Sequence, residues 1–202
     1  MAIEHDAIQD GKRHEPKGIS TALEKQVYVA NGSGSGMWRK LSTSDLEAFN
    51  EVYGGLTASF NTSVFAVPKS TDTLLNNNLD YVLVPSTIWD NVPQTATNGL
   101  AFTSDSIVVQ VKGVYRIEMW ASVKTSTNNT SIGFKYAKNG VVLSGRRPKH
   151  FLRNAGEAAN MSAYGYIQLE AGDEIELYVA SDVATNLLIE DATFSLELKR
   201  TL

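Results

Sequence analysis

The chain of 202 residues is long enough for one domain with a buried core, or for a short segment attached to a domain of about 150 residues. Its hydrophobic fraction of 43% and charged fraction of 20% are those of a folded protein and exclude a disordered tail. The net charge of -4 excludes a general attraction to nucleic acid or anionic lipid, and the lack of cysteine excludes disulfides and thiolate metal sites.

The first 18 residues predict an extended arm. They are polar and charged, and Pro16 removes a backbone N–H and biases Glu15 toward an extended conformation. The beginning of the sequence has no basic segment followed by an apolar core, and no run reaches the roughly 18 apolar residues that a membrane span requires. We therefore expect a product made in the cytoplasm without a signal peptide and without membrane insertion.

A β-hairpin is predicted next. Residues 26–30 and 37–41 alternate between apolar and polar side chains, and a Gly/Ser loop joins them. Tyr28 and Trp38 take facing positions in this hairpin. An isolated hairpin is only marginally stable in water, so we expect this one to lean on another surface.

A short helix is expected from about Asp45 to Tyr53. Ser44 and Glu47 form a capping-box pattern, and an apolar stripe at helical spacing follows. Gly54 and Gly55 are expected to end this helix. This predicts a boundary between an N-terminal anchoring segment, residues 1–54, and a larger domain, residues 55–202.

From residue 56 onward every predicted element is a strand, so the fold class is all-β. These strands are rich in β-branched and aromatic residues and are bounded by turn residues. Asn139-Gly140 is the strongest hairpin signal. The expected strands are 56–67, 81–84, 107–111, 114–124, 131–138, 141–144, 161–169, 174–181 and 192–198. Such a series predicts an antiparallel jelly-roll β-sandwich, with the role of residues 68–106 left open.

The closing strands show the clearest patterning. Ile175, Leu177 and Val179 share one face, and the strand over 192–198 alternates in the same way. The turn Ala171-Gly172-Asp173 precedes the first of these strands. One sheet face is thus expected to be apolar and the other wet.

The larger domain resembles the tumour-necrosis-factor and complement-type jelly roll. The likeness rests on residues 113–117, 132–140, 169–177 and 194–196, and it covers roughly residues 98–202. It implies a compact homotrimer. It also implies packing residues around a threefold axis at the aromatic positions Tyr115, Tyr166, Tyr178 and Phe194.

The N-terminal segment resembles a different group, the bacteriophage virion proteins of head-fibre, decoration and tail-fibre type. The likeness rests on His14-Glu-Pro-Lys-Gly18 and on residues 27–38, and covers about 30 residues. It implies a virion anchor followed by a projecting trimer. The residues expected to anchor the chain to the virion are Lys12, Arg13, His14, Glu15, Pro16, Lys17, Gly18, Tyr28 and Trp38.

No catalytic or metal site, and no cofactor, is predicted. His5, His14 and His150 are far apart in the sequence, and none has a partner at ligand spacing. The acidic residues at 170–176 and 190–191 are read as turn formers and solvent-face residues, although a calcium ion at such a turn is left open. We therefore expect no enzymatic activity.

One basic cluster is a candidate for ligand or inter-subunit contact: Arg146, Arg147, Lys149, His150 and Arg153. It could meet an acidic glycan or a neighbouring subunit, or it could be a solvated loop that pairs with the acidic turns. Nucleic acid is a weaker partner, because Phe151 is the only aromatic residue interleaved with these charges.

Two functions remain open. The preferred hypothesis is a structural virion protein, a capsid head-fibre or decoration protein that docks by its N-terminal segment and presents a homotrimeric β head. The alternative is a tail-fibre or receptor-binding adhesin that recognises a host-surface glycan. For the adhesin, the expected contacts are loops 125–130 and 145–156, an exposed Trp89 and Tyr136, and the basic cluster.

Overall fold

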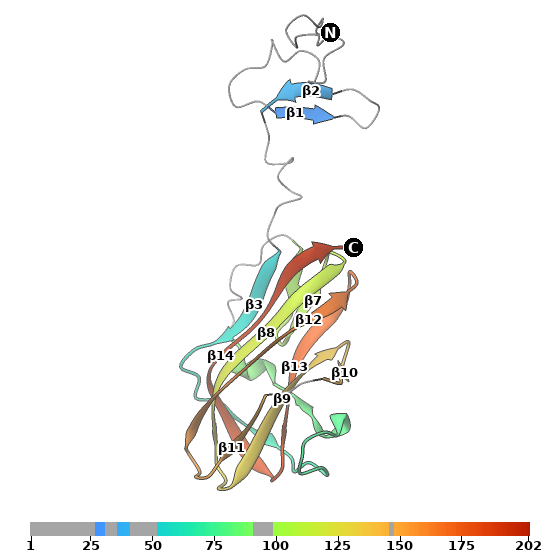
Figure 1. The fold of residues 1–202 in the computed structure, drawn as a ribbon. Helices are drawn as coiled ribbons and strands as arrows, with labels where there is room; N and C mark the ends of the chain where they lie inside the picture. Colours follow the sequence, from blue (N-terminus) through green and yellow to red (C-terminus); the bar gives the residue numbers. More distant parts are fainter. Residues whose placement is uncertain (1–26, 31–35, 41–51, 91–98, 146–147) are drawn as a thin grey trace, which may run out of the picture. The chain divides into compact units, whose positions relative to one another are not determined.

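The computed structural model describes residues 27–30, 36–40, 52–90, 99–145 and 148–202, and it divides the chain into two compact units, residues 1–50 and 51–202 (Figure 1). In the first unit, β1 (Val27–Ala30) pairs with β2 (Gly36–Arg39) in an antiparallel hairpin. Tyr28 lies directly opposite Trp38 in this hairpin. The predicted hairpin and its facing positions are confirmed.

The second unit is an antiparallel β-sandwich of jelly-roll type, which confirms the predicted fold class. Its first layer, here called the β14 sheet, has the strand order β12-β8-β14-β3, and β4 also pairs with β14. The members are β3 (Tyr53–Ala58), β4 (Val64–Val67), β8 (Gly113–Thr125), β12 (Ala158–Leu169) and β14 (Thr185–Thr201).

The second layer, here called the β13 sheet, has the order β10-β9-β13-β7-β6, with β11 paired to β9 and β5 paired to β13. Its members are β5 (Val82–Leu83), β6 (Leu100–Phe102), β7 (Ser106–Val109), β9 (Thr130–Lys138), β10 (Val141–Val142), β11 (Lys149–Leu152) and β13 (Glu174–Ser181). Two short 3-10 turns, η5 (Asn78–Asp80) and η6 (Ser86–Ile88), lie in the segment before β6.

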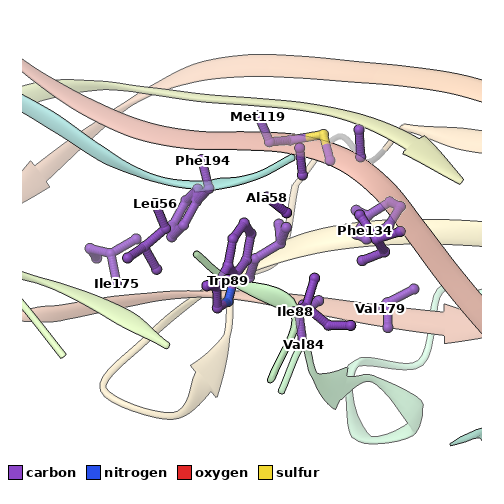
Figure 2. Close-up of a cluster of buried hydrophobic side chains, with 14 of the residues drawn as sticks. Leu56, Ala58, Val84, Ile88, Trp89, Met119, Phe134, Ile175, Val179 and Phe194 are labelled. Atoms are coloured by element: carbon purple, nitrogen blue, oxygen red, sulfur yellow. The ribbon is translucent and has the colours of Figure 1, made fainter. Parts of the chain in front are cut away.

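The core fills the space between these two sheets. Phe194 and Met119 extend from the β14 sheet toward Ile175, Val179 and Phe134 of the β13 sheet (Figure 2). The alternation predicted for the closing strands is confirmed, because Ile175, Leu177 and Val179 are all buried. Each large buried side chain of this kind stabilises the fold by about 1.5–3 kcal/mol relative to an exposed one.

Residues 68–106, whose role the sequence left open, contribute to the sandwich where they are described. Trp89 is buried beside Phe194, with ring centroids 6.4 Å apart, and Ile88 and Val84 are buried with it (Figure 2). The backbone N–H of Asp90 donates to the carbonyl of Thr57 at 2.7 Å, which ties this segment to β3. Residues 84–90 therefore fill part of the core between the two sheets.

The expected end of the helix is wrong. The helix was expected to run to Tyr53 and to end at Gly54-Gly55, but these three residues begin β3 and pair with residues 195–197 of β14. Residues 45–51 of that helix lie outside the described residues. Close packing between β3 and β14 explains why residue 55 is a glycine. A Cβ on Gly55 would lie 2.5 Å from the carbonyl oxygen of Phe194.

The expected start of the last strand and the loop expected around the basic cluster are also wrong. Glu190 and Asp191 were expected to open the last hairpin, but β14 already begins at Thr185 and carries them at a register shift in its middle. The strand expected over 56–67 is interrupted at the same level and forms β3 and β4. Residues 149–152, expected in a loop, form β11 on the edge of β9.

The close packing at Gly55 gives a stability prediction. Gly55→Ala should lower the free energy of unfolding by about 1–3 kcal/mol, because the added methyl group meets backbone that cannot move aside. The measurement is urea denaturation at a fixed protein concentration. The matched control is Gly165→Ala in the same sheet, where the nearest atom would be 3.8 Å away and we expect a change within about 0.5 kcal/mol. Equal stabilities of the two variants would contradict the pairing of Gly55 with Ser195.

Candidate self-association face

The outer face of the β14 sheet carries an unusual number of exposed aromatic side chains. Tyr164 and Tyr166 on β12 are 71% and 66% exposed, and Trp120 on β8 and Tyr53 on β3 are 41% and 39% exposed. The strands place them there by alternation, since Met119 and Ile117 point inward and their neighbours point outward. We call this surface the aromatic face.

Strand register arranges the aromatic face in rows that cross the sheet. In one row Tyr164 lies beside Glu118, then Ser195, then Gly55; two residues along, Tyr166 lies beside Arg116, then Glu197, then Tyr53. A third row runs from Ser162 through Trp120 and Thr193 to Thr57. Tyr164, Tyr166 and Trp120 lie at the β12 and β8 side of these rows, and Tyr53 lies at the β3 side.

Electrostatic contacts hold part of this face in place. The Arg116 guanidinium lies 5.6 Å from the centroid of the Tyr164 ring and also pairs with Glu118 at 2.9 Å. Lys124 pairs with Glu190 at 2.7 Å further along the same face. Because these charges are paired within the chain, the face offers aromatic area without a strong net charge of its own.

At the edge of the sandwich, Tyr136 links β9 of the β13 sheet to β12 of the β14 sheet. The hydroxyl of Tyr136 on β9 donates to the carbonyl of Ala163 at 2.9 Å, and its ring stacks on Phe194 with centroids 6.0 Å apart. Burial, together with the nearby Glu118 carboxylate, raises the pKa of the Tyr136 hydroxyl, so it stays a neutral donor. A groove of about 480 Å³ lies here, lined among others by Tyr136, Leu143, Tyr164 and Tyr166.

The structure corrects two contacts expected for an adhesin and two expected for a threefold axis. Trp89 is buried and Tyr136 is half-buried, so neither ring is a free surface platform. Tyr115 and Phe194 are fully buried in the core, where burial raises the pKa of Tyr115 to about 12, and Tyr178 lies on the β13 sheet. Of the four aromatic positions that the resemblance implied, Tyr166 alone belongs to the aromatic face.

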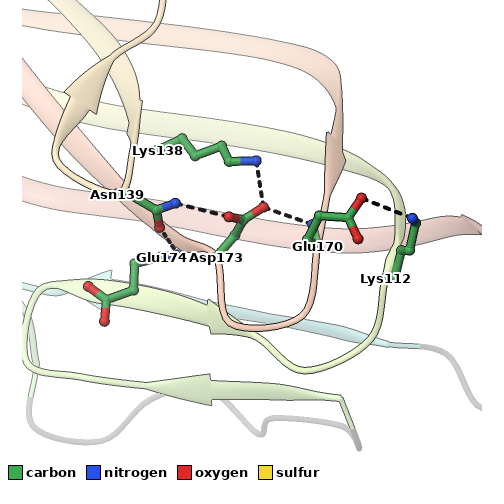
Figure 3. Close-up of polar contacts among 6 residues, drawn as sticks. All are labelled: Lys112, Lys138, Asn139, Glu170, Asp173 and Glu174. Carbon is green, nitrogen blue, oxygen red and sulfur yellow. Dashed lines mark hydrogen bonds and ion pairs between the residues drawn. The ribbon is translucent and has the colours of Figure 1, made fainter.

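The acidic turn that was considered for calcium is occupied by protein contacts. Asp173 pairs with Lys138 at 2.6 Å, accepts from the Asn139 amide at 3.0 Å and accepts from the backbone N–H of Glu170 at 2.8 Å (Figure 3). The Asn139 side chain in turn accepts from the N–H of Glu174. Across the described ranges, no group of three His, Asp or Glu residues could hold a metal ion. This cluster joins the β9–β10 and β12–β13 turns and has a structural role.

The remaining predicted contact residues are only partly described. Lys12, Arg13, His14, Glu15, Pro16, Lys17 and Gly18 lie outside the described residues, as do Arg146 and Arg147. Lys149, His150 and Arg153 are exposed on or beside β11, and the Lys149 ammonium donates to the carbonyl of Thr73 at 3.1 Å. No helix in the described ranges is long and apolar enough to cross a membrane.

No protein-family model matches the sequence, and no curated protein matches it either. Among solved structures, Eiger, a TNF of S. frugiperda, is similar at 13% identity and a TM-score of 0.48, over 76% of this chain and 96% of that chain. Murine APRIL is similar at 14% identity and a TM-score of 0.46, over 72% and 99%. The globular domain of zebrafish complement 1qA is similar at 13% identity and a TM-score of 0.46, over 74% and 98%. At these identities the likeness is one of fold alone.

The contacts of Asp173 predict a pH-dependent contribution to stability. Burial alone would raise the pKa of this carboxyl, but Lys138, the Glu170 N–H and Asn139 outweigh it and lower the pKa below its usual 3.8. The stabilisation is therefore present above pH 3.8 and is lost as the pH falls through the lowered value.

Asp173→Asn should accordingly reduce the free energy of unfolding by about 1–2 kcal/mol at pH 7, with a smaller difference from the natural chain at a pH below the lowered pKa of Asp173. Denaturant titrations at several pH values measure this. Glu174→Gln is the control, because its exposed carboxylate makes no contact in the cluster beyond its backbone (Figure 3), and it should change stability by less than about 0.5 kcal/mol. A constant difference across the pH range would refute the role of the charge.

Proposed function

We propose that this protein is a structural bacteriophage virion protein, a head-fibre or decoration protein whose N-terminal segment docks on the particle and whose β-sandwich associates as a homotrimer. The observation that carries the homotrimer is the aromatic face, and the virion role rests on the resemblance of residues 14–18 and 27–38. Soluble monomers rarely expose large contiguous apolar patches, and aromatic residues are enriched where proteins associate. A β-sandwich whose outer sheet face displays Tyr164, Tyr166 and Trp120 is suited to binding its own copies.

The proposed mechanism is binding without turnover. In the first unit, the opposed positions Tyr28 and Trp38 provide the aromatic area that anchors an interface. In this proposal Lys12, Arg13 and Lys17 pair with carboxylates of the shell. Trimerisation would join three weak docking contacts in one particle-bound unit, and the effective concentration of the second and third contacts makes attachment firm.

Two of the surface contacts expected for the alternative, a glycan-binding adhesin, are not exposed. Trp89 contributes to the core, and the Tyr136 hydroxyl is already bonded to Ala163. We therefore prefer the structural role to the adhesin.

The aromatic face gives a direct test of self-association. The full chain should have a mass near three times 22.0 kDa in light scattering on a sizing column. Replacing both Tyr164 and Tyr166 with serine should give a folded monomer, because these rings are exposed and contribute little to the core. Val141→Ser, an exposed apolar residue on the other sheet, should leave the mass unchanged. A natural chain that is monomeric at all concentrations would exclude the homotrimer.

Virion docking has its own test. Changing Tyr28 and Trp38 to alanine should reduce the copies of the protein on purified particles by at least tenfold, because each docking contact loses its aromatic area. Quantitative gel analysis of particles measures this, with light scattering to show that the trimer is intact. Undiminished copy number on the particles would remove the docking proposal.

A further inference from the structure

The turn between β9 and β10 contains a dipeptide with covalent chemistry of its own. Asn139 and Gly140 have φ values of 52° and 75°, and Lys138 pairs with Val141 across them, as in a two-residue hairpin turn. Both turn residues are exposed to solvent. Because glycine has no side chain to shield its backbone nitrogen, that nitrogen can reach the carboxamide of the preceding asparagine.

The reaction open to this dipeptide is deamidation. The Gly140 nitrogen loses its proton to solvent base and bonds to Cγ of Asn139. The bond between Cγ and Nδ2 then breaks, and the amide takes up a proton from water and leaves as ammonia. Water adds across one of the two carbonyl–nitrogen bonds of the resulting cyclic imide and yields aspartate or isoaspartate. The side chain thereby exchanges two N–H donors for a negative charge.

The fold restrains the attacking nitrogen. The backbone N–H of Gly140 donates to the Glu176 carboxylate on β13 at 2.7 Å. Loss of the proton would leave a second negative charge directly beside this carboxylate, and like charges at so short a distance repel each other. The anionic nitrogen that the reaction requires is therefore disfavoured for as long as the contact with Glu176 is made.

The carboxamide of Asn139 is restrained at both of its polar atoms. Nδ2 donates to the Asp173 carboxylate at 3.0 Å, and Oδ1 accepts from the backbone N–H of Glu174 at 2.8 Å (Figure 3). Asp173 is itself held by the Lys138 ammonium at 2.6 Å. Both hydrogen bonds must break before Cγ can turn toward the nitrogen of the next residue, so the reaction requires local opening of the turn.

We propose that Asn139 is a deamidation site that the folded domain keeps unreactive, and that the contacts of Glu176 and Asp173 with the turn keep it so. The rate of reaction then depends on how often the turn opens. The change is also irreversible in its effect on the fold. An aspartate at position 139 would place a carboxylate where Nδ2 now meets Asp173, and two carboxylates at hydrogen-bond distance repel each other. A chain that has opened and reacted therefore cannot restore this cluster.

Peptide mass spectrometry measures the reaction directly. The full chain is incubated in mildly alkaline buffer, with and without a denaturing concentration of guanidinium, and aspartate plus isoaspartate at position 139 is followed over time. The folded chain should react at least about tenfold more slowly than the unfolded chain. In guanidinium, Asn31-Gly32 and Asn98-Gly99 provide the same dipeptide in the same molecule, and all three sites should react at similar rates.

Glu176→Ala is the decisive variant, because it frees the Gly140 N–H and leaves the dipeptide unchanged. It should deamidate at position 139 about fivefold faster than the natural folded chain, and Asp173→Ala should act in the same direction by freeing Nδ2. The matched control is Glu174→Ala. It removes a carboxylate from the same strand but keeps the backbone N–H that binds Asn139, and its rate should stay within about twofold of the natural chain. Circular dichroism confirms that each variant is folded during the incubation, and all variants should react alike in guanidinium.

Three results would overturn the proposal. Equal rates in the folded and unfolded natural chain would show that the fold does not protect Asn139. A slower reaction in Glu176→Ala would mean that this carboxylate activates the nitrogen as a base, which is the opposite role. Equal acceleration by Glu174→Ala and Glu176→Ala would assign the effect to a general loosening of the turn and not to the contact with Gly140.

Discussion

The structure depends on the pairing of β14 with strands on both of its sides. β8 lies along one side for almost its whole length, and β3 and β4 share the other side. This arrangement fixes the alternation of β14, so Phe194 points into the core and Ser195 points out. A slip by one residue would exchange these two roles and place a phenyl ring in water.

The same pairing accounts for the interruption between β3 and β4. β14 has a register shift between Ile189 and Asp191, and on its other side the chain leaves the sheet after Ala58 and returns at Val64. The N–H of Asn61 donates to the carbonyl of Glu190 at this level, and the N–H of Phe60 donates to the Asp191 carboxylate. The register shift in β14 is thus matched by the gap between β3 and β4. The Asp191 carboxylate binds backbone at this gap, and the Glu190 carboxylate pairs with Lys124.

The alternation of apolar and polar residues predicted the strands well where one face of the strand is exposed to solvent. The alternation over 174–181 and 192–198 was correct, and Asn139-Gly140 forms the expected tight turn with positive φ at both residues. Patterning failed at Gly54 and Gly55, because glycine read locally is a helix stop. Only the approach of the Phe194 carbonyl, from a strand distant in the sequence, explains why a glycine lies at position 55 of β3. Local sequence carries no information about that approach.

Side-chain placement was predicted less well than strand placement, for a related reason. Trp89 and Tyr136 were expected on the surface, but both rings pack beside Phe194 between the two sheets. The aromatic face was only partly anticipated: Tyr166 was named, whereas Tyr164 and Trp120 were not. The alternation of β8 and β12 contained the signal, since in both strands an aromatic residue occurs on the polar face.

Two kinds of aromatic residue therefore occur in the β14 sheet, and their surroundings separate them. Phe194 and Tyr115 fill the interior, where the Tyr115 hydroxyl donates to the carbonyl of Val111 at 2.6 Å. Tyr164 and Tyr166 are largely exposed to solvent, although the Arg116 guanidinium lies over the Tyr164 ring. Burying two such rings against a second copy stabilises an interface, while leaving them exposed contributes nothing to the single chain. The proposed self-association would place both rings in such an interface, and it therefore rests on the aromatic face and not on a pocket.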